Sequence, residues 1–195
     1  GVDSDDPGGP AFDWVDITSV GTPVTFNIGT RDDGNASNIP LGFTFPFYGN
    51  SYSTVNVCTN GWVSFTNITT SLSNSALPST GAPENLLAVF WDDQDLRTAG
   101  NAYTYYDGTR FIISYVGVPR YSSGGPYTYQ VLLYPSGKIV YQYLDMQGTR
   151  LNEATIGIQN DLKNDGLTVV YNLNYVHNGL AVELRAMPDW LTVAP

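Results

Sequence analysis

Residues 127–144 read YTYQVLLYPSGKIVYQYL, two runs of strand-forming residues on either side of a short turn. In the first run Tyr127, Tyr129 and Val131 alternate with their neighbours and fall on one face of an extended chain. The turn between the runs ends in Gly137, and the second run is again aromatic and β-branched. The stretch therefore predicts a β-hairpin.

The same strand–turn–strand pattern recurs along the chain. Further turn signals with strand-forming residues on both sides are Asn60-Gly61, Asp107-Gly108, Asn164-Asp165-Gly166 and Asn178-Gly179. Asn or Asp followed by Gly supplies the positive φ angles of tight hairpin turns. For the last signal, the expected strands are Leu173–Val176 and Leu180–Arg185. The pattern predicts an all-β fold, a hairpin-rich antiparallel β-sandwich of jelly-roll-like type.

The length and the two ends suggest how the chain is organised. We expect residues 1–186 to form one sandwich, since 195 residues suit a single large β domain. Residues 1–10 are rich in Gly, Pro and Asp and are expected to lie along the surface. Residues 187–195 are mostly apolar and are expected to form a C-terminal strand or arm, a linker, or the start of a following domain.

The composition excludes several classes of partner. The net charge is −10, and the only lysines are Lys138 and Lys163. Nucleic acid is not an expected partner, because a groove that binds the phosphate backbone needs clustered basic side chains. No apolar run is long enough to insert into a membrane. Cys58 is the only cysteine, so no internal disulfide and no cysteine-based zinc site can form.

Four motifs in order give a family resemblance. They are Leu41–Gly49 (LGFTFPFYG), Val55–Phe65 (VNVCTNGWVSF), Leu86–Asp93 (LLAVFWDD) and Tyr127–Gly137 (YTYQVLLYPSG). Their succession resembles nidogen-like (NIDO-type) modules of large secreted or surface bacterial proteins. The resemblance implies an extracellular location and an adhesive or structural role, without a shared set of catalytic residues. It also implies that residues 187–195 are the start of a following Ig-like domain, because Pro188–Pro195 (PDWLTVAP) is similar to the first strand of the Ig-like repeats that often follow such modules. The scarcity of lysine and the abundance of Ser, Thr, Asn and Tyr agree with an extracellular surface.

Two groups of aspartates are candidate calcium ligands. They are Asp3, Asp5 and Asp6 near the start, and Asp92, Asp93 and Asp95 after Trp91. Calcium takes six to eight oxygen ligands, which clustered carboxylates and loop carbonyls can supply. If the N-terminal segment folds across the loop after Trp91, the two groups would form one site. The competing interpretation is that these aspartates form turns and carry solvated charge.

Exposed tyrosines are candidates for a binding rim. Tyr121, Tyr127 and Tyr129 flank the Gly- and Ser-rich loop Ser122–Pro126. Flat amphipathic rings suit a contact surface, although core packing explains such residues equally well.

A catalytic set is missing from the sequence. His177 is the only histidine, and it stands next to a turn. There are only three glutamates, and no nucleophile elbow or zinc-protease motif occurs. We therefore expect no enzyme activity.

Two functions stay open at this point. The first is a non-enzymatic adhesive or structural domain that binds a protein partner or itself, with Trp190, Leu191 and Val193 adding a strand to a neighbour's sheet. The second is a calcium-dependent carbohydrate-binding module of a larger secreted enzyme, with a glycan as ligand.

Overall fold

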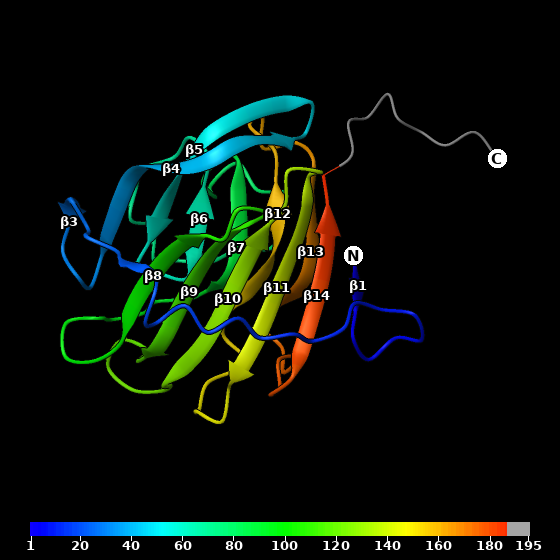
Figure 1. Cartoon of the computed structure of the whole chain (residues 1–195). Coiled ribbons are helices and arrows are strands. Elements are labelled where there is room, and N and C mark those ends of the chain that lie inside the picture. The colour runs from blue at the N-terminus through cyan, green and yellow to red at the C-terminus, as the bar shows by residue number, and fades with distance from the viewer. Residues whose placement is uncertain (187–195) are drawn as a thin grey trace.

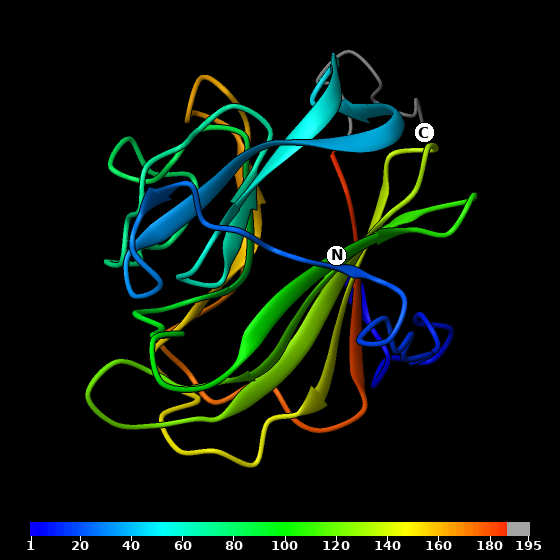
Figure 2. The same cartoon turned by 60° about the vertical axis from the view of Figure 1, so that its left-hand side comes forward.

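The computed structural model describes residues 1–186, which form two seven-stranded antiparallel sheets packed face to face (Figure 1, Figure 2). In spatial order the first sheet contains β1 (Val2–Asp3), β14 (Leu180–Arg185), β11 (Lys138–Asp145), β10 (Tyr127–Leu133), β9 (Phe111–Val118), β8 (Asn101–Tyr106) and β2 (Thr22–Pro23). The second contains β13 (Gly166–Tyr171), β12 (Thr155–Gln159), β7 (Leu86–Trp91), β6 (Trp62–Ser64), β5 (Asn50–Cys58), β4 (Gly34–Phe47) and β3 (Ile28–Gly29). The predicted all-β sandwich is confirmed. Within residues 1–186 there is no helix long and apolar enough to cross a membrane.

Most of the predicted hairpins form. β10 pairs with β11 across the Pro-Ser-Gly turn, and the pairs β5–β6, β8–β9 and β12–β13 enclose their predicted turns. The hairpin expected around Asn178-Gly179 was wrong, because residues 173–176 form no strand. All six residues of β14 pair instead with β11, from Lys138↔Arg185 to Tyr143↔Leu180. β14 is therefore held by a long-range partner, and the residues before its turn remain a loop.

Tyrosines on the inner face of the first sheet cross the core to the second. The hydroxyl of Tyr115 donates to the carbonyl of Cys58 at 2.7 Å, that of Tyr141 to Gly157 at 3.0 Å, and that of Tyr143 to Val89 at 2.7 Å. All three tyrosines are fully buried. A buried phenol is tolerated when its hydroxyl finds a partner, so these side chains serve as core residues that also join the sheets.

A strap of residues 11–20 covers the outer face of the first sheet. Figure 1 shows it as the blue segment that crosses in front of these strands. Ile17 packs with Ile112 and Leu132 there, and the backbone of Asp13 exchanges two hydrogen bonds with the Gln142 side chain. Strands β10 and β11 are therefore covered on both faces.

A long loop covers the outer face of the second sheet. The indole N–H groups of Trp62 and Trp91 both donate to the carbonyl of Ser71, at 2.9 and 3.0 Å. The Asn35 amide donates to the carbonyl of Thr69 in the same loop. With both outer faces partly covered, the ends and edges of the sandwich are the surfaces left for binding.

Candidate functional site

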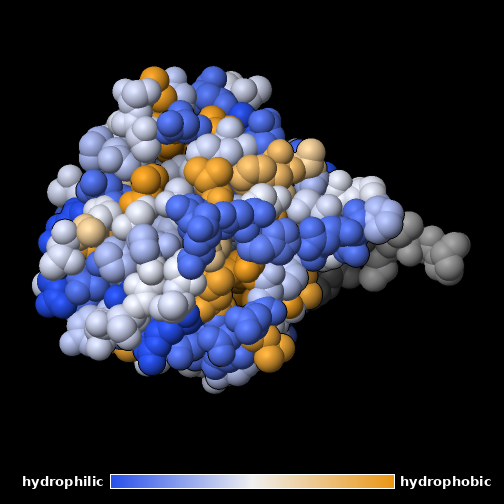
Figure 3. Space-filling model, turned by 90° about the horizontal axis from the view of Figure 1, so that it is seen from below, coloured by the Kyte–Doolittle hydropathy of each residue, from blue (hydrophilic) through white to orange (hydrophobic). Residues whose placement is uncertain are grey.

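Four loops gather at one end of the sandwich, which we call the loop end: residues 30–33, 92–100, 119–126 and 146–154. Backbone hydrogen bonds join them, from Leu96 to Arg31 at 2.8 Å and from Tyr121 to Asp93 at 2.8 Å. The N–H of Gly125 donates to the carbonyl of Thr149. Figure 3 shows the molecule from below, where the loops after β9 and β11 lie; blue and pale atoms cover much of this face, and orange, hydrophobic atoms gather near its middle. The loops therefore form one connected surface.

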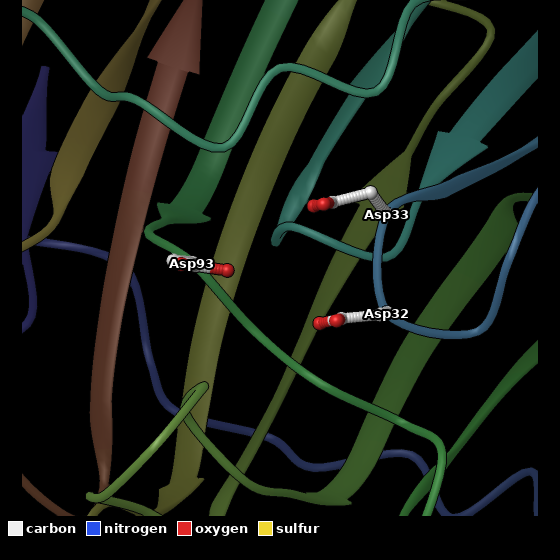
Figure 4. Close-up of side chains that lie close together, drawn as sticks. All are labelled: Asp32, Asp33 and Asp93. Atoms are coloured by element: carbon white, nitrogen blue, oxygen red, sulfur yellow. The ribbon is translucent and has the colours of Figure 1, made fainter.

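Three carboxylates meet at the loop end. Oxygens of Asp32, Asp33 and Asp93 lie within 4.8 Å of one another. Figure 4 shows Asp32 and Asp33 on the loop before β4, facing Asp93 on the loop after β7. We call these residues the acidic trio. Within residues 1–186 it is the one cluster of three potential metal-ligating side chains of this kind.

The turn beneath the trio explains its position. The Asn60 amide donates to Asp33 at 2.8 Å, and its oxygen accepts the N–H of Gln94 at 2.8 Å. Gly61 follows with φ 74°, and a Cβ there would stand 2.1 Å from the carbonyl oxygen of Phe90. The Asn-Gly turn thus fits tightly under the loop that carries Asp93, because only glycine allows this approach.

The surroundings of the trio disfavour the charged forms of Asp93 and Asp32. Burial, together with the neighbouring charges of Asp33 and Asp32, raises the pKa of Asp93 to about 6. Burial and the charge of Asp95 also raise the pKa of Asp32, although Arg97 lies 3.0 Å from this carboxylate. Three hard oxygen ligands at this spacing fit calcium chemistry, with carbonyls or water completing the coordination.

The predicted calcium ligands are only partly brought together. Asp93 belongs to the trio, but Asp92 pairs with Arg120 at 2.7 Å and Asp95 with Arg97 at 2.7 Å. The sequence did not single out Asp32 and Asp33, which precede Asp93 by sixty residues. The available signal was an Asp-Asp pair before Gly34 that matches the pair after Trp91.

The prediction that the N-terminal aspartates join those after Trp91 in one calcium site was wrong, because the structure holds the two groups apart. Asp3 accepts the hydroxyl of Tyr175 at 2.5 Å, and Asp5 lies 2.9 Å from the ring nitrogen of His177. Asp6 lies in the turn that follows β1, its carbonyl accepting the N–H of Gly9. β1 is four strands from β9, whose end carries the partner of Asp92, a separation of about 19 Å at normal strand spacing.

The tyrosine rim is reduced to one residue. Tyr121 is 44% exposed at the loop end, whereas Tyr127 and Tyr129 are fully buried, so their assignment to an exposed rim was wrong. Both lie on the inner face of β10. Their hydroxyls donate to the Thr149 carbonyl and the Gln94 side chain, each at 2.7 Å.

A cleft of about 490 Å³ surrounds Tyr121. We call it the Tyr121 cleft, and it is lined by Asp95, Arg97, Thr98, Pro119, Arg120, Tyr121, Ser122, Ser123 and Gly124. Its volume is in the range of small-molecule sites, roughly 300–1,000 Å³. The cleft and the trio share the 92–100 loop, and Arg97 contacts Asp32 of the trio and Asp95 of the cleft.

The three glutamates and His177 are arranged in pairs with oppositely charged or hydrogen-bonding groups. Each glutamate pairs with a basic side chain: Glu84 with Lys163 at 3.7 Å, Glu153 with Arg120 at 3.0 Å, and Glu183 with Arg185 at 3.2 Å. His177 hydrogen-bonds to Asp5 and to the backbone carbonyl of Asn178. Neither arrangement resembles a pair of facing catalytic carboxylates or an activated nucleophile. The predicted assembly residues Trp190, Leu191 and Val193 lie outside the described residues.

Comparison with known proteins identifies the family of the chain. The family model described as NIDO related matches residues 11–185, which span both sheets. The search of solved structures returned no match. Modules of this family are typically extracellular. Because the match covers most of the sequence, the chain belongs to the NIDO-related family.

Proposed function

We propose that this NIDO-related domain is a non-enzymatic extracellular module with an adhesive or structural role, acting through protein–protein contacts that include strand addition. The observation that carries the proposal is the free edge of β13. The other sheet edges among residues 1–186, β1, β2 and β3, are two residues long. Very short edge strands prevent unwanted pairing, whereas a longer uncharged edge is a template for it.

β13 has the properties of such a template. Its six residues, Gly166–Tyr171, contain no charge and no proline. The turns at its two ends carry Leu162 and Leu173, which are 72% and 66% exposed. An added strand would gain main-chain hydrogen bonds from β13 and apolar contacts from these leucines.

The hydrogen-bond pattern shows which groups of β13 face outward. The N–H of Asn172 donates to the carbonyl of Ala154, so these two residues form a hydrogen-bonded pair. The next pair, Tyr171↔Thr155, is then a non-hydrogen-bonded pair. The N–H and carbonyl of Tyr171 therefore point away from β12 and toward the free edge.

The proposed donor is the C-terminal strand of a second copy. Trp190, Leu191 and Val193 belong to a short apolar segment that lacks basic residues. Such a segment makes few sequence demands on its acceptor, because strand addition relies on the backbone.

A pair of variants at Tyr171 tests the edge. Tyr171→Pro removes an outward N–H and leaves the β12 pairing intact, while Tyr171→Ala removes the same ring and keeps the N–H. Sedimentation velocity and electron microscopy of the full chain should show concentration-dependent assembly of the wild type and Tyr171→Ala. Tyr171→Pro and Leu191→Asp should weaken it about tenfold or more, equivalent to about 1.4 kcal/mol. A chain that stays monomeric at all concentrations, or equal assembly of the Pro and Ala variants, refutes strand addition between copies.

Calcium-dependent carbohydrate binding is the second candidate function. The acidic trio beside the Tyr121 cleft favours it, since one loop connects the two. A glycan array in calcium and in EGTA tests it. Binding that disappears in EGTA supports this function, and an array without signal in either buffer refutes it.

A further inference from the structure

Tyr121 is an exposed aromatic residue held in a fixed position. Its N–H donates to the carbonyl of Asp93 at 2.8 Å, and its carbonyl accepts the N–H of Ser123 at 2.7 Å and Nη1 of Arg120 at 3.2 Å. The guanidinium of Arg97 lies over one side of the ring, 5.8 Å from its centre. With the backbone and one ring side fixed, the exposed part of Tyr121 faces the cleft with little conformational entropy left to lose on binding.

Other exposed tyrosines in the described chain are placed differently. Tyr106 is 40% exposed, but its ring packs against Phe43 at 5.7 Å and its hydroxyl donates to the carbonyl of Gly108. Tyr171, also 40% exposed, lies on the β13 edge. Of these three tyrosines, only Tyr121 lines the 490 Å³ cleft, so a ligand bound there would stack on its ring.

The rest of the cleft surface is rich in hydroxyl groups. Thr98, Ser122 and Ser123 are exposed beside Tyr121. Ser122 has φ 65°, a left-handed conformation that is uncommon for serine. A hydroxyl both donates and accepts hydrogen bonds, which matches the hydroxyl groups of a sugar.

The charges of the cleft disfavour an anionic ligand. Arg97 is paired with Asp32 and Asp95, at 3.0 and 2.7 Å. Arg120 is likewise paired with Asp92 and Glu153, at 2.7 and 3.0 Å. Each arginine thus faces two carboxylates, and the whole chain carries a net charge of −10. Both guanidinium charges are thus already balanced by carboxylates, which disfavours a sulfate, phosphate or sialic acid carboxylate.

We infer that the Tyr121 cleft binds an uncharged oligosaccharide, with one sugar ring stacked on Tyr121 and its hydroxyl groups bonded to the rim of Thr98, Ser122 and Ser123. The inference deepens the second candidate function by naming its site and ligand class, and it is independent of strand addition at β13. The proposed glycan site does not include a metal ion in the Tyr121 cleft.

The test uses the full chain on an array of neutral and acidic glycans, with calcium and with EGTA. Calorimetric titration then follows with cellohexaose, xylohexaose and mannohexaose as probes. The expected result is binding of neutral members and rejection of sulfated and sialylated ones. Tyr121→Ala should weaken the affinity about tenfold or more, a typical effect of losing a stacked ring. Tyr121→Phe should keep it within about threefold, because the ring remains.

Tyr171→Ala is the matched control, since it removes a similarly exposed ring elsewhere and should leave glycan affinity unchanged. Circular dichroism and thermal unfolding of Tyr121→Ala verify that it folds. Binding that depends on Tyr121 supports the inference in either buffer, and the EGTA arm decides separately whether calcium is required. No binding of neutral glycans, preferential binding of acidic ones, or equal affinities of Tyr121→Ala and Tyr171→Ala would overturn it. Assembly of Tyr121→Ala should match that of the wild type. A loss of glycan binding can then be distinguished from a failure of strand addition.

Discussion

Replacing Asp93 with asparagine removes one carboxylate from the acidic trio and leaves a side chain of the same shape. Within residues 1–186 the hydrogen bonds of Asp93 are made by its backbone, whose N–H donates to the Asp92 carboxylate and whose carbonyl accepts the N–H of Tyr121, so the change breaks neither of them. Asp93→Asn therefore removes a charge that burial and the neighbouring carboxylates both disfavour.

The magnitude follows from the pKa of Asp93, which burial first and then Asp33 and Asp32 raise from 3.8 to about 6. Between these two values the folded state holds more protons than the unfolded state, so the free energy of unfolding falls as pH rises from about 4 to 6. The full change corresponds to about 3 kcal/mol. Because the side chain is partly exposed, solvent screening reduces this to about 1 kcal/mol. At pH 7.5 and low calcium, Asp93→Asn should be the more stable protein by about this amount.

Urea denaturation in the presence of a chelator, from pH 4.0 to 7.5, measures the effect. The two stability curves should converge near pH 4 and separate by pH 7. Asp6→Asn is the control, since it changes the net charge equally on an exposed residue away from the trio. Parallel curves for wild type and Asp93→Asn over the whole range would refute the interpretation that burial and the neighbouring carboxylates disfavour the charge of Asp93.

Three further experiments test the packing of the domain. Tyr129→Phe removes a buried hydroxyl that donates to Gln94 at 2.7 Å, so the free energy of unfolding in urea should fall by about 1–3 kcal/mol; a change as small as that of exposed Tyr121→Phe would contradict this. Gly61→Ala would place a Cβ 2.1 Å from the carbonyl oxygen of Phe90, so it should lower the free energy of unfolding by more than about 3 kcal/mol or prevent folding. Gly108→Ala, also at positive φ but in open space, should cost only about 1–2 kcal/mol, and equal losses would count against the close approach. The thiol of Cys58 is fully buried and burial raises its pKa, so a disulfide reagent should label it in urea and leave the native protein unlabelled; rapid native labelling would show that the region opens.

The sequence was informative about strands and turns because these depend on local chemistry. Asn60-Gly61 and Asp107-Gly108 predicted hairpins that the structure contains. Tyr127 and Tyr129 were misplaced because alternation separates two faces of a strand without identifying the inner one. In β10 both faces are covered, by the core and by the strap, so no polar face marked the outside.

The candidate site was harder to predict because it is made by topology. Asp93 was singled out from its position after a buried strand, but its partners Asp32 and Asp33 lie on the far side of β4, β5 and β6 in the sequence. The order β7–β6–β5–β4 brings both loops to the same end of the second sheet. No local pattern shows that order, so nothing around Gly34 marked Asp32 and Asp33 as partners of Asp93.

The tyrosine hydroxyls that cross the core have a mechanical consequence. Those of Tyr115, Tyr141 and Tyr143 reach carbonyl oxygens on three strands or strand ends of the opposite sheet. Sliding one sheet over the other would break these bonds together and leave polar atoms unpaired in an apolar interior, at a cost of about 1–3 kcal/mol each. In a domain pulled between two partners, these hydrogen bonds would resist sliding of one sheet over the other, in addition to the resistance of the packed side chains.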